Sequence, residues 1–149
     1  MKIVGTGSCL PQRVVSNDDL AAIMDTSDEW ISSRTGIRNR HIATTETTTS
    51  LACCAVKSAL QDAGIDGSEI DLIIAASVST DKIVPSLACQ IQAEIGAGRA
   101  VAFDINAACS GFLFGLATAD AYFKTGRFHK AVVVMMTKQS SSRLRNLNW

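Results

Sequence analysis

The sequence predicts an α/β fold in which helices cover both faces of a mostly parallel sheet. Short apolar segments alternate along the chain with segments of helical periodicity, and this alternation is typical of layered α-β-α folds. Residues 72–76 are apolar without interruption, as in a strand that is buried on both faces. An apolar content of 47% in 149 residues is enough to form a core of ordinary size.

The strands are predicted by short runs of β-branched and other apolar residues. They comprise residues 2–7, 71–78, 101–105 and 131–136, and we expect the strand at 101–105 to be buried. Gly5-Thr6-Gly7 has too few glycines for a dinucleotide-binding loop, and we expect it to form a tight exit from the first strand.

The helices are predicted by apolar residues at helical spacing, together with polar residues suited to capping. We expect helices at residues 18–24, 49–63, 86–95 and 110–124, and a further short helix that begins at residue 28. Asn17 is the predicted N-cap of the helix at 18–24, and Thr26 or Ser27 is that of the helix that begins at residue 28. Gly64 ends the helix at 49–63. The last helix is apolar or small almost all round, which predicts that it is buried.

Composition excludes several classes of protein. The 14 basic and 14 acidic residues are mixed along the chain, which argues against nucleic-acid binding. No apolar run reaches the ~18 residues of a membrane span, and the N-terminus does not resemble a signal peptide. Five cysteines without a CxxC pair indicate reduced thiols rather than disulfides or a metal site. We therefore expect a cytoplasmic protein, with the cysteines other than Cys109 packed in its interior.

Cys109 is the candidate nucleophile, because it lies where a predicted strand gives way to a helix. Unpaired N–H groups and the helix dipole favour a thiolate at a helix N-terminus, and the thiolate is the reactive form. Small neighbours leave room for an acyl group. The alternative is an inert, buried cysteine, and local chemistry does not choose between the two.

Four ordered motifs resemble the β-ketoacyl-acyl-carrier-protein synthase III family of thiolase-fold condensing enzymes. They are Ile3-Val4-Gly5-Thr6-Gly7-Ser8-Cys9-Leu10-Pro11, Asp25-Thr26-Ser27-Asp28-Glu29-Trp30-Ile31, Arg34-Thr35-Gly36-Ile37-Arg38-Asn39-Arg40-His41-Ile42, and the segment Asn106-Ala107-Ala108-Cys109-Ser110. The resemblance covers residues 1–134 and implies the N-terminal half of the duplicated thiolase fold. Residues 135–149 form a divergent tail.

The resemblance also implies a function. In this family the cysteine that matches Cys109 takes an acyl group from acyl-CoA and condenses it with malonyl-acyl carrier protein, with decarboxylation, to start fatty-acid synthesis. No cofactor is bound permanently. The residue matching Trp30 stacks on the adenine of coenzyme A, that matching Arg34 contacts its phosphates, and Thr26 matches a position near the nucleotide. Trp30 and Arg34 are four residues apart, so we expect them to share one face of the predicted helix. Without the resemblance, Trp30 would be a core aromatic and Arg34 a solvated charge.

The family's catalytic His and Asn come from the second half of the fold, which this sequence does not contain. We therefore expect the chain to be inactive in condensation by itself, and to form a homodimer or to associate with a separate second half. Two alternatives stay open. One is another cysteine condensing enzyme, such as a polyketide starter synthase or a hydroxymethylglutaryl-CoA synthase. The other is a non-catalytic remnant or a partner-binding module.

Overall fold

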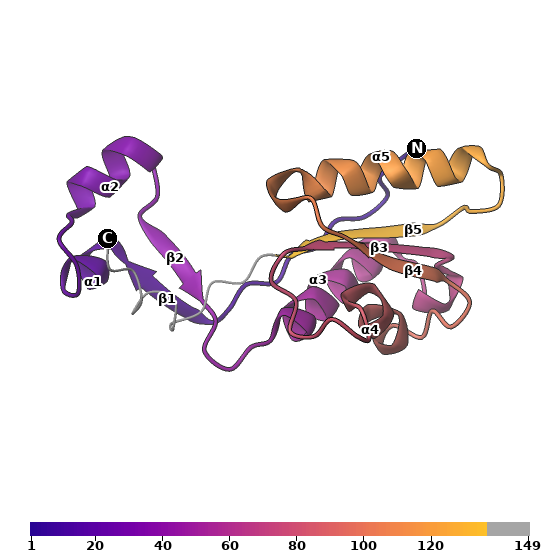
Figure 1. Cartoon of the computed structure of the whole chain (residues 1–149), viewed down its shortest axis with the longest axis horizontal. Helices are drawn as coiled ribbons and strands as arrows, with labels where there is room; N and C mark the ends of the chain where they lie inside the picture. The colour runs from indigo at the N-terminus through magenta and orange to yellow at the C-terminus, as the bar shows by residue number, and fades with distance from the viewer. Residues whose placement is uncertain (137–149) are drawn as a thin grey trace. The chain divides into compact units, whose positions relative to one another are not determined.

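The computed structural model of the chain describes residues 1–136, which form two compact units (Figure 1). Among these residues, the first unit contains residues 1–9 and 47–136, and the second contains residues 10–46. Among residues 1–136, no helix has the length and apolar character that crossing a membrane requires.

The first unit is built on a parallel sheet of three strands. They are β3 (Leu72–Ser77), β4 (Val101–Ile105) and β5 (Ala131–Met136), in the order β4-β3-β5. Leu72 is in register with Val101 on one side and with Ala131 on the other. The predicted parallel sheet is confirmed, and β4 and β5 have the predicted bounds.

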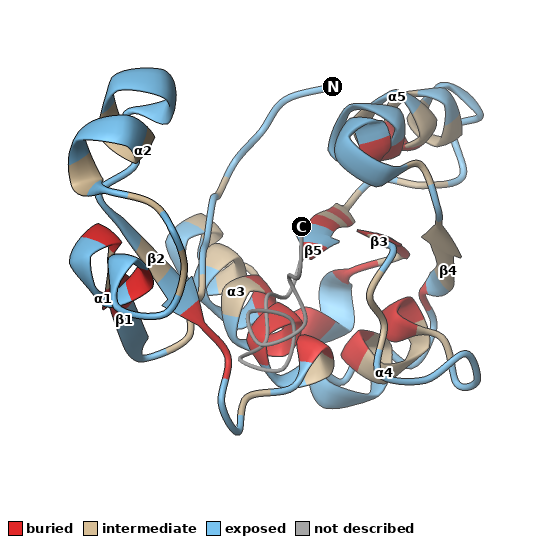
Figure 2. Ribbon diagram, turned by 60° about the vertical axis from the view of Figure 1, so that its left-hand side comes forward, coloured by how far each residue is buried: buried red, intermediate tan, exposed pale blue. Residues whose placement is uncertain are grey.

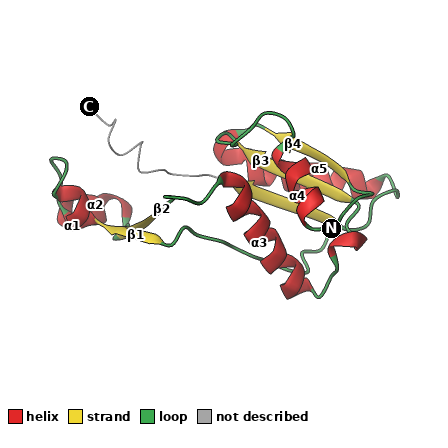
Figure 3. Ribbon diagram, turned by 90° about the horizontal axis from the view of Figure 1, so that it is seen from below, coloured by secondary structure: helices red, strands yellow, loops and turns green. Residues whose placement is uncertain are grey.

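Helices cover both faces of this sheet (Figure 3). They are α3 (Thr48–Ala63), α4 (Leu87–Glu94) and α5 (Gly111–Lys124), with short 3₁₀ turns η1 (Gly67–Glu69) and η2 (Ala108–Ser110). Ile73 and Ala75 of β3 pack in the core with α3 and α4, whereas Leu72 and Ile74 pack with Ala119 of α5. Alternation of side chains along β3 therefore fills both layers, and the strongest burial lies in β3, α3 and α4 (Figure 2).

Residues 2–7 do not form the predicted strand. They run as an extended segment against α3, and the backbone N–H of Thr6 donates to Asp62 at 2.8 Å. A Cβ atom on Gly7 would lie 2.3 Å from the carbonyl oxygen of Ala55, and one on Gly5 would lie 2.5 Å from that of Ala59. The two glycines thus permit backbone-to-helix contact, rather than the strand exit that we expected.

Three predictions of burial are wrong for the described residues. Helix α5 is not buried all round, because only the face with Gly111, Gly115 and Ala119 meets the sheet. Leu113 on the opposite face is 68% exposed. Strand β4 is half-buried because it is an edge strand of the described sheet, and Cys54 is exposed on the outer side of α3.

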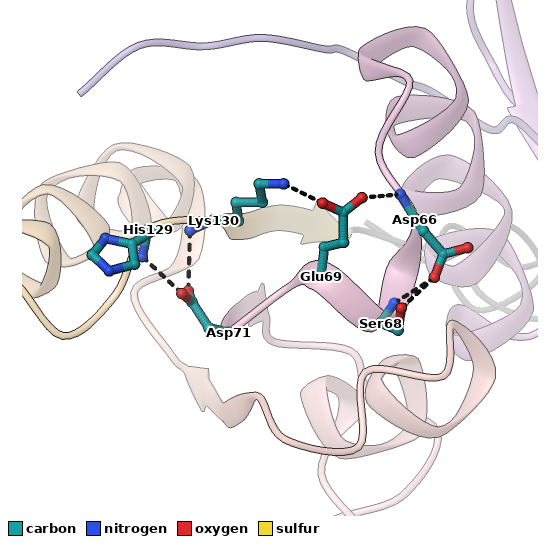
Figure 4. A network of polar contacts seen from close by, with 6 residues as sticks. All are labelled: Asp66, Ser68, Glu69, Asp71, His129 and Lys130. Carbon is teal, nitrogen blue, oxygen red and sulfur yellow. Dashed lines mark hydrogen bonds and ion pairs between the residues drawn. The ribbon is translucent and has the colours of Figure 1, made fainter.

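A polar network ties the start of β3 to the start of β5 (Figure 4). The Asp71 carboxylate accepts from the backbone N–H groups of His129, at 2.8 Å, and Lys130, at 3.1 Å. The Lys130 ammonium pairs with Glu69 of η1. Because Asp71 holds two successive amides just before β5, it sets the register of that strand against β3.

The second unit contains a two-stranded antiparallel sheet and two short helices. They are β1 (Arg13–Ser16), α1 (Asn17–Ala21), α2 (Asp28–Thr35) and β2 (Asn39–Ile42). The two strands were not predicted, because their segments are mostly polar and show little alternation. A small core of Val15, Leu20 and Ile42 holds the unit together, with Met24 and Ile31 packed at its margin.

Helix α1 begins at a different cap from the predicted one. Ser16, not Asn17, is the N-cap: its hydroxyl oxygen accepts from the backbone N–H of Asp19, and Asp19 accepts from the Ser16 N–H in return. The Ser16-x-x-Asp19 spacing is that of a capping box and was visible in the sequence. The side chain of Asn17 is thereby free for another role.

Glu46 gives the second unit a pH-dependent contact. Hydrogen bonds from the backbone N–H groups of Gln12, then of Thr44 and of Glu46 itself, lower the pKa of the Glu46 carboxyl from 4.5 to about 2. Such a depressed pKa stabilises the folded state above pH 4.5, and this contribution is lost as the pH falls toward 2.

We expect Glu46→Gln to unfold at lower urea concentration than the parent at pH 7, with the difference shrinking as the pH falls from 4.5 to 3. Urea titrations at pH 7, 4.5 and 3 measure this. A difference that stays the same at every pH would show that the charge of Glu46 contributes nothing.

Candidate functional site

Cys109 lies in η2, the single 3₁₀ turn between the end of β4 and the start of α5. Its thiol is free and the residue is exposed. This placement at the start of a helix confirms the position predicted from the sequence, and Cys109 is not a buried cysteine. The thiolate character of Cys109 stays a prediction.

The residue before Cys109 has an unusual backbone conformation. Ala108 has φ +43°, and it is the one residue other than glycine with a positive φ among residues 1–136. A side-chain-bearing residue in this region stores strain, and such residues gather at functional sites. Sequence reasoning missed this feature, because alanine gives no signal for a left-handed conformation.

Glycine brings the start of α5 close to the sheet beneath Cys109. A Cβ atom on Gly111 would lie 2.8 Å from the Cβ of Ala76 in β3, and one on Gly115 would lie 2.7 Å from Cγ1 of Val133 in β5. Both distances are shorter than a normal carbon–carbon contact. The two glycines therefore determine how near α5, and with it the η2 turn, lies to the sheet.

Asp104 joins the strand before Cys109 to a neighbouring helix. Its carboxylate accepts from the backbone N–H of Leu87 at 2.8 Å and of Ala88 at 2.7 Å, while Ser86 accepts from Cys89 N–H. The first three N–H groups of α4 are thus paired, and a carboxylate also stabilises the positive end of the helix dipole. We had not singled out Asp104.

In the second unit, Trp30 and Arg34 form a stacked pair on α2. The guanidinium carbon of Arg34 lies 4.5 Å from the centre of the Trp30 ring, within cation–π range. Trp30 is 54% exposed, so the interpretation as a core aromatic is wrong. The predicted shared face is confirmed, and α2 presents an exposed indole beside a cation.

The start of α2 is set by the predicted cap. Ser27 accepts from the backbone N–H of Trp30 at 3.0 Å, so Ser27, rather than Thr26, is the N-cap. Thr26 is half-buried in the loop directly before it. Thr26, Trp30 and Arg34 thus lie together in the second unit, whereas Cys109 lies in the first.

Two other polar residues have structural roles. Since a carbonyl oxygen can only accept, Nδ1 of His41 donates to Pro11, at 2.6 Å, which agrees with a structural rather than a chemical histidine. Arg40 donates to the carbonyl oxygen of Val15 at 3.0 Å and to the side chain of Asn17. Its guanidinium is therefore directed into the unit.

Comparison with known proteins shows which solved structures and which family the chain is similar to. The structure superposes on solved thiolase-fold condensing enzymes. The family model described as 3-oxoacyl-[acyl-carrier-protein (ACP)] synthase III matches residues 103–146. The resemblance seen in the sequence is therefore confirmed: the chain is similar to β-ketoacyl-acyl-carrier-protein synthase III proteins.

Individual proteins of this kind are similar to the chain over most of its length. A β-ketoacyl-[acyl-carrier-protein] synthase III of Streptococcus pneumoniae is 53% identical over 133 residues, which are 89% of this chain and 41% of that relative. The crystal structure of 3-oxoacyl-[acyl-carrier-protein] synthase III from Aquifex aeolicus is 48% identical, with TM-score 0.87 over 90% of this chain and 44% of that one. The priming β-ketosynthase of the R1128 polyketide pathway is 38% identical, with TM-score 0.86 over 90% and 40%. The chain thus spans about two fifths of the length of the relatives it matches.

Proposed function

We propose that this chain carries the acyl-accepting cysteine and the coenzyme A-binding helix of a β-ketoacyl-acyl-carrier-protein synthase III. The observation that carries the proposal is the exposed Cys109 on η2 at the start of α5, in a chain 53% identical to a synthase III. The exposed stack of Trp30 and Arg34 supports the coenzyme A part.

The proposed chemistry begins with transfer of an acyl group. The Cys109 thiol gives up its proton as its sulfur attacks the thioester carbonyl of acyl-CoA. The bond from that carbonyl to the CoA sulfur breaks, and CoA takes up a proton and leaves as its thiol. In the second step malonyl-acyl carrier protein loses carbon dioxide, and the resulting enolate displaces Cys109 to give a 3-oxoacyl product. No permanently bound cofactor takes part, and we propose a cytoplasmic location, which the five cysteines without a CxxC pair support.

On α2, the indole of Trp30 offers a face for the adenine, since base stacking on an aromatic side chain contributes ~1–3 kcal/mol. Arg34 offers a guanidinium that can pair with phosphate oxygens. Thr26 completes the proposed nucleotide subsite. The resemblance assigns all three roles, and the exposure of Trp30 is the structural feature that permits them.

Mass spectrometry of the intact protein after incubation with acetyl-CoA and longer acyl-CoAs tests the proposal. We expect one acyl adduct on the parent chain and none on Cys109→Ala. Cys54→Ala is the matched control, because Cys54 is the other exposed cysteine, and it should keep the adduct. An adduct that persists in Cys109→Ala, or none on folded parent protein, would move the assignment to a non-catalytic module.

A second candidate is the priming step of a polyketide synthase, which the 38% identity to the R1128 priming β-ketosynthase favours. The same experiment distinguishes fatty-acid initiation from polyketide priming, because it shows which acyl chain length labels Cys109 best. Preferred labelling by acetyl-CoA supports fatty-acid initiation, whereas preferred labelling by longer or branched acyl-CoAs supports polyketide priming.

A further inference from the structure

The side chain of Asn17 is buried in the second unit, with 2% of its surface exposed. Its amide nitrogen donates to the Asp28 carboxylate at 2.7 Å and to the carbonyl oxygen of Ile37 at 2.8 Å. Its amide oxygen accepts from the Arg40 guanidinium. Both amide protons and the oxygen are therefore paired, so this is a fully satisfied buried polar group.

These contacts hold α2 at both ends. Asp28 is the first residue of α2, and Ile37 follows Gly36, the residue that ends the helix. Arg40 lies on β2 and also donates to the carbonyl oxygen of Val15 on β1. One amide thus links the two ends of α2 to the two-stranded sheet.

Apolar packing provides little alternative support for α2. None of its side chains is fully buried, and only the half-buried Ile31 packs against the small core of the unit. The direction in which α2 presents Trp30 and Arg34 therefore depends mainly on the hydrogen bonds of Asn17. Satisfied buried networks of this kind select one arrangement, and a partly broken one is costly.

We propose that Asn17, together with Asp28 and Arg40, is a positioning residue for the nucleotide end of the acyl-CoA substrate. It touches neither adenine nor phosphate; it orients the helix whose Trp30 and Arg34 would bind them. This inference rests on the proposed function and extends it to three residues that lie behind the binding surface. The Arg40 guanidinium donates its hydrogen bonds within the second unit, so we do not assign it to the phosphates.

The test compares an acyl donor that carries the nucleotide with one that lacks it. Binding of coenzyme A and of adenosine 3′,5′-bisphosphate is measured by calorimetry, and acylation of Cys109 is measured with acetyl-CoA and with acetyl-pantetheine. We expect Asn17→Ala to weaken binding of both nucleotides by about tenfold, since small misplacement of binding groups has effects of this size or larger. Acylation by acetyl-pantetheine should stay at the parent rate, which a general loss of structure would not allow.

Asn39→Ala is the matched control. Asn39 is an exposed asparagine of β2 in the same unit, so its removal should leave nucleotide binding unchanged. Should Asn17→Ala fail to fold, a second pair of variants replaces it. Asp28→Asn retains an oxygen that can accept from Asn17 and should bind like the parent, whereas Asp28→Ala should lose affinity about tenfold.

The possible outcomes distinguish the positioning role of Asn17 from the nucleotide site itself. Equal nucleotide affinity in Asn17→Ala and Asn39→Ala, or in both Asp28 variants, would overturn the positioning role while leaving the coenzyme A site intact. Equal loss of acylation with both acyl donors would also overturn it. Equal affinity of the parent and Trp30→Ala for adenosine 3′,5′-bisphosphate would instead overturn the proposed nucleotide site, and the positioning role with it.

Discussion

Asp104→Ala is expected to destabilise the first unit by about 2–4 kcal/mol, because it leaves two N–H groups at the start of α4 without a partner. Those N–H groups belong to Leu87 and Ala88, whose side chains are 1% and 0% exposed. Water is poorly placed to replace the carboxylate there. The helix also loses a negative charge at the positive end of its dipole.

Urea unfolding measures the change, and hydrogen exchange locates it. The amide protons of Leu87 and Ala88 should exchange faster in Asp104→Ala, ahead of those in the centre of α4. Glu94→Ala is the control, since Glu94 is an acidic residue of the same unit that pairs with Lys57 at an exposed position. Exposed ion pairs contribute little, so equal effects of the two changes would show that the Asp104 contacts are unimportant.

Gly111→Ala is expected to lower the stability of the first unit by ~1–3 kcal/mol, because the added methyl group overfills the space between α5 and β3. Its carbon would lie 2.8 Å from the Cβ of Ala76. The Cβ atom of Ala76 is bonded directly to the backbone of the buried strand β3, so it can move aside only if that backbone moves as well. Helix α5 must therefore shift outward, and it carries the turn that holds Cys109.

Two measurements test this expectation. Urea unfolding gives the loss of stability, and the rate of Cys109 alkylation by iodoacetamide reports displacement of η2. Gly98→Ala is the matched change, since a Cβ atom on Gly98 meets nothing within 4 Å, and its stability should stay within ~0.5 kcal/mol of the parent. Alanine is the better helix former, so a more stable Gly111→Ala protein would show that the close approach is not required.

The sequence predicted the parts of the fold that depend on local pattern. The continuous apolar run of β3 marked a strand covered on both faces. Gly64 ends α3 in a left-handed conformation, as predicted, and this is a short-range feature. The position of Cys109 at the start of a helix followed in the same way, and the spacing of Trp30 and Arg34 placed them on one face of α2.

Other predictions were wrong because similar sequences have different partners in space. Residues 2–7 have the composition of a strand, but Gly5 and Gly7 fit against the alanines of α3. The apolar composition of α5 did not reveal which face meets the sheet. Strands β1 and β2 are largely polar, and their pairing is supported by side chains distant in the sequence, such as Arg40 and Asn17.

The sequence by itself therefore determined the order of the elements in the first unit, the position of the candidate nucleophile Cys109, and the family that its motifs resemble. Only the tertiary structure decided that Arg34 stacks on an exposed Trp30, that Asp104 caps α4, and that Asn17 holds both ends of α2. The physical reason is the distance along the sequence over which each kind of interaction acts. Helical periodicity and caps act within a few residues, whereas these contacts join groups whose partners are chosen by the packing of the whole unit.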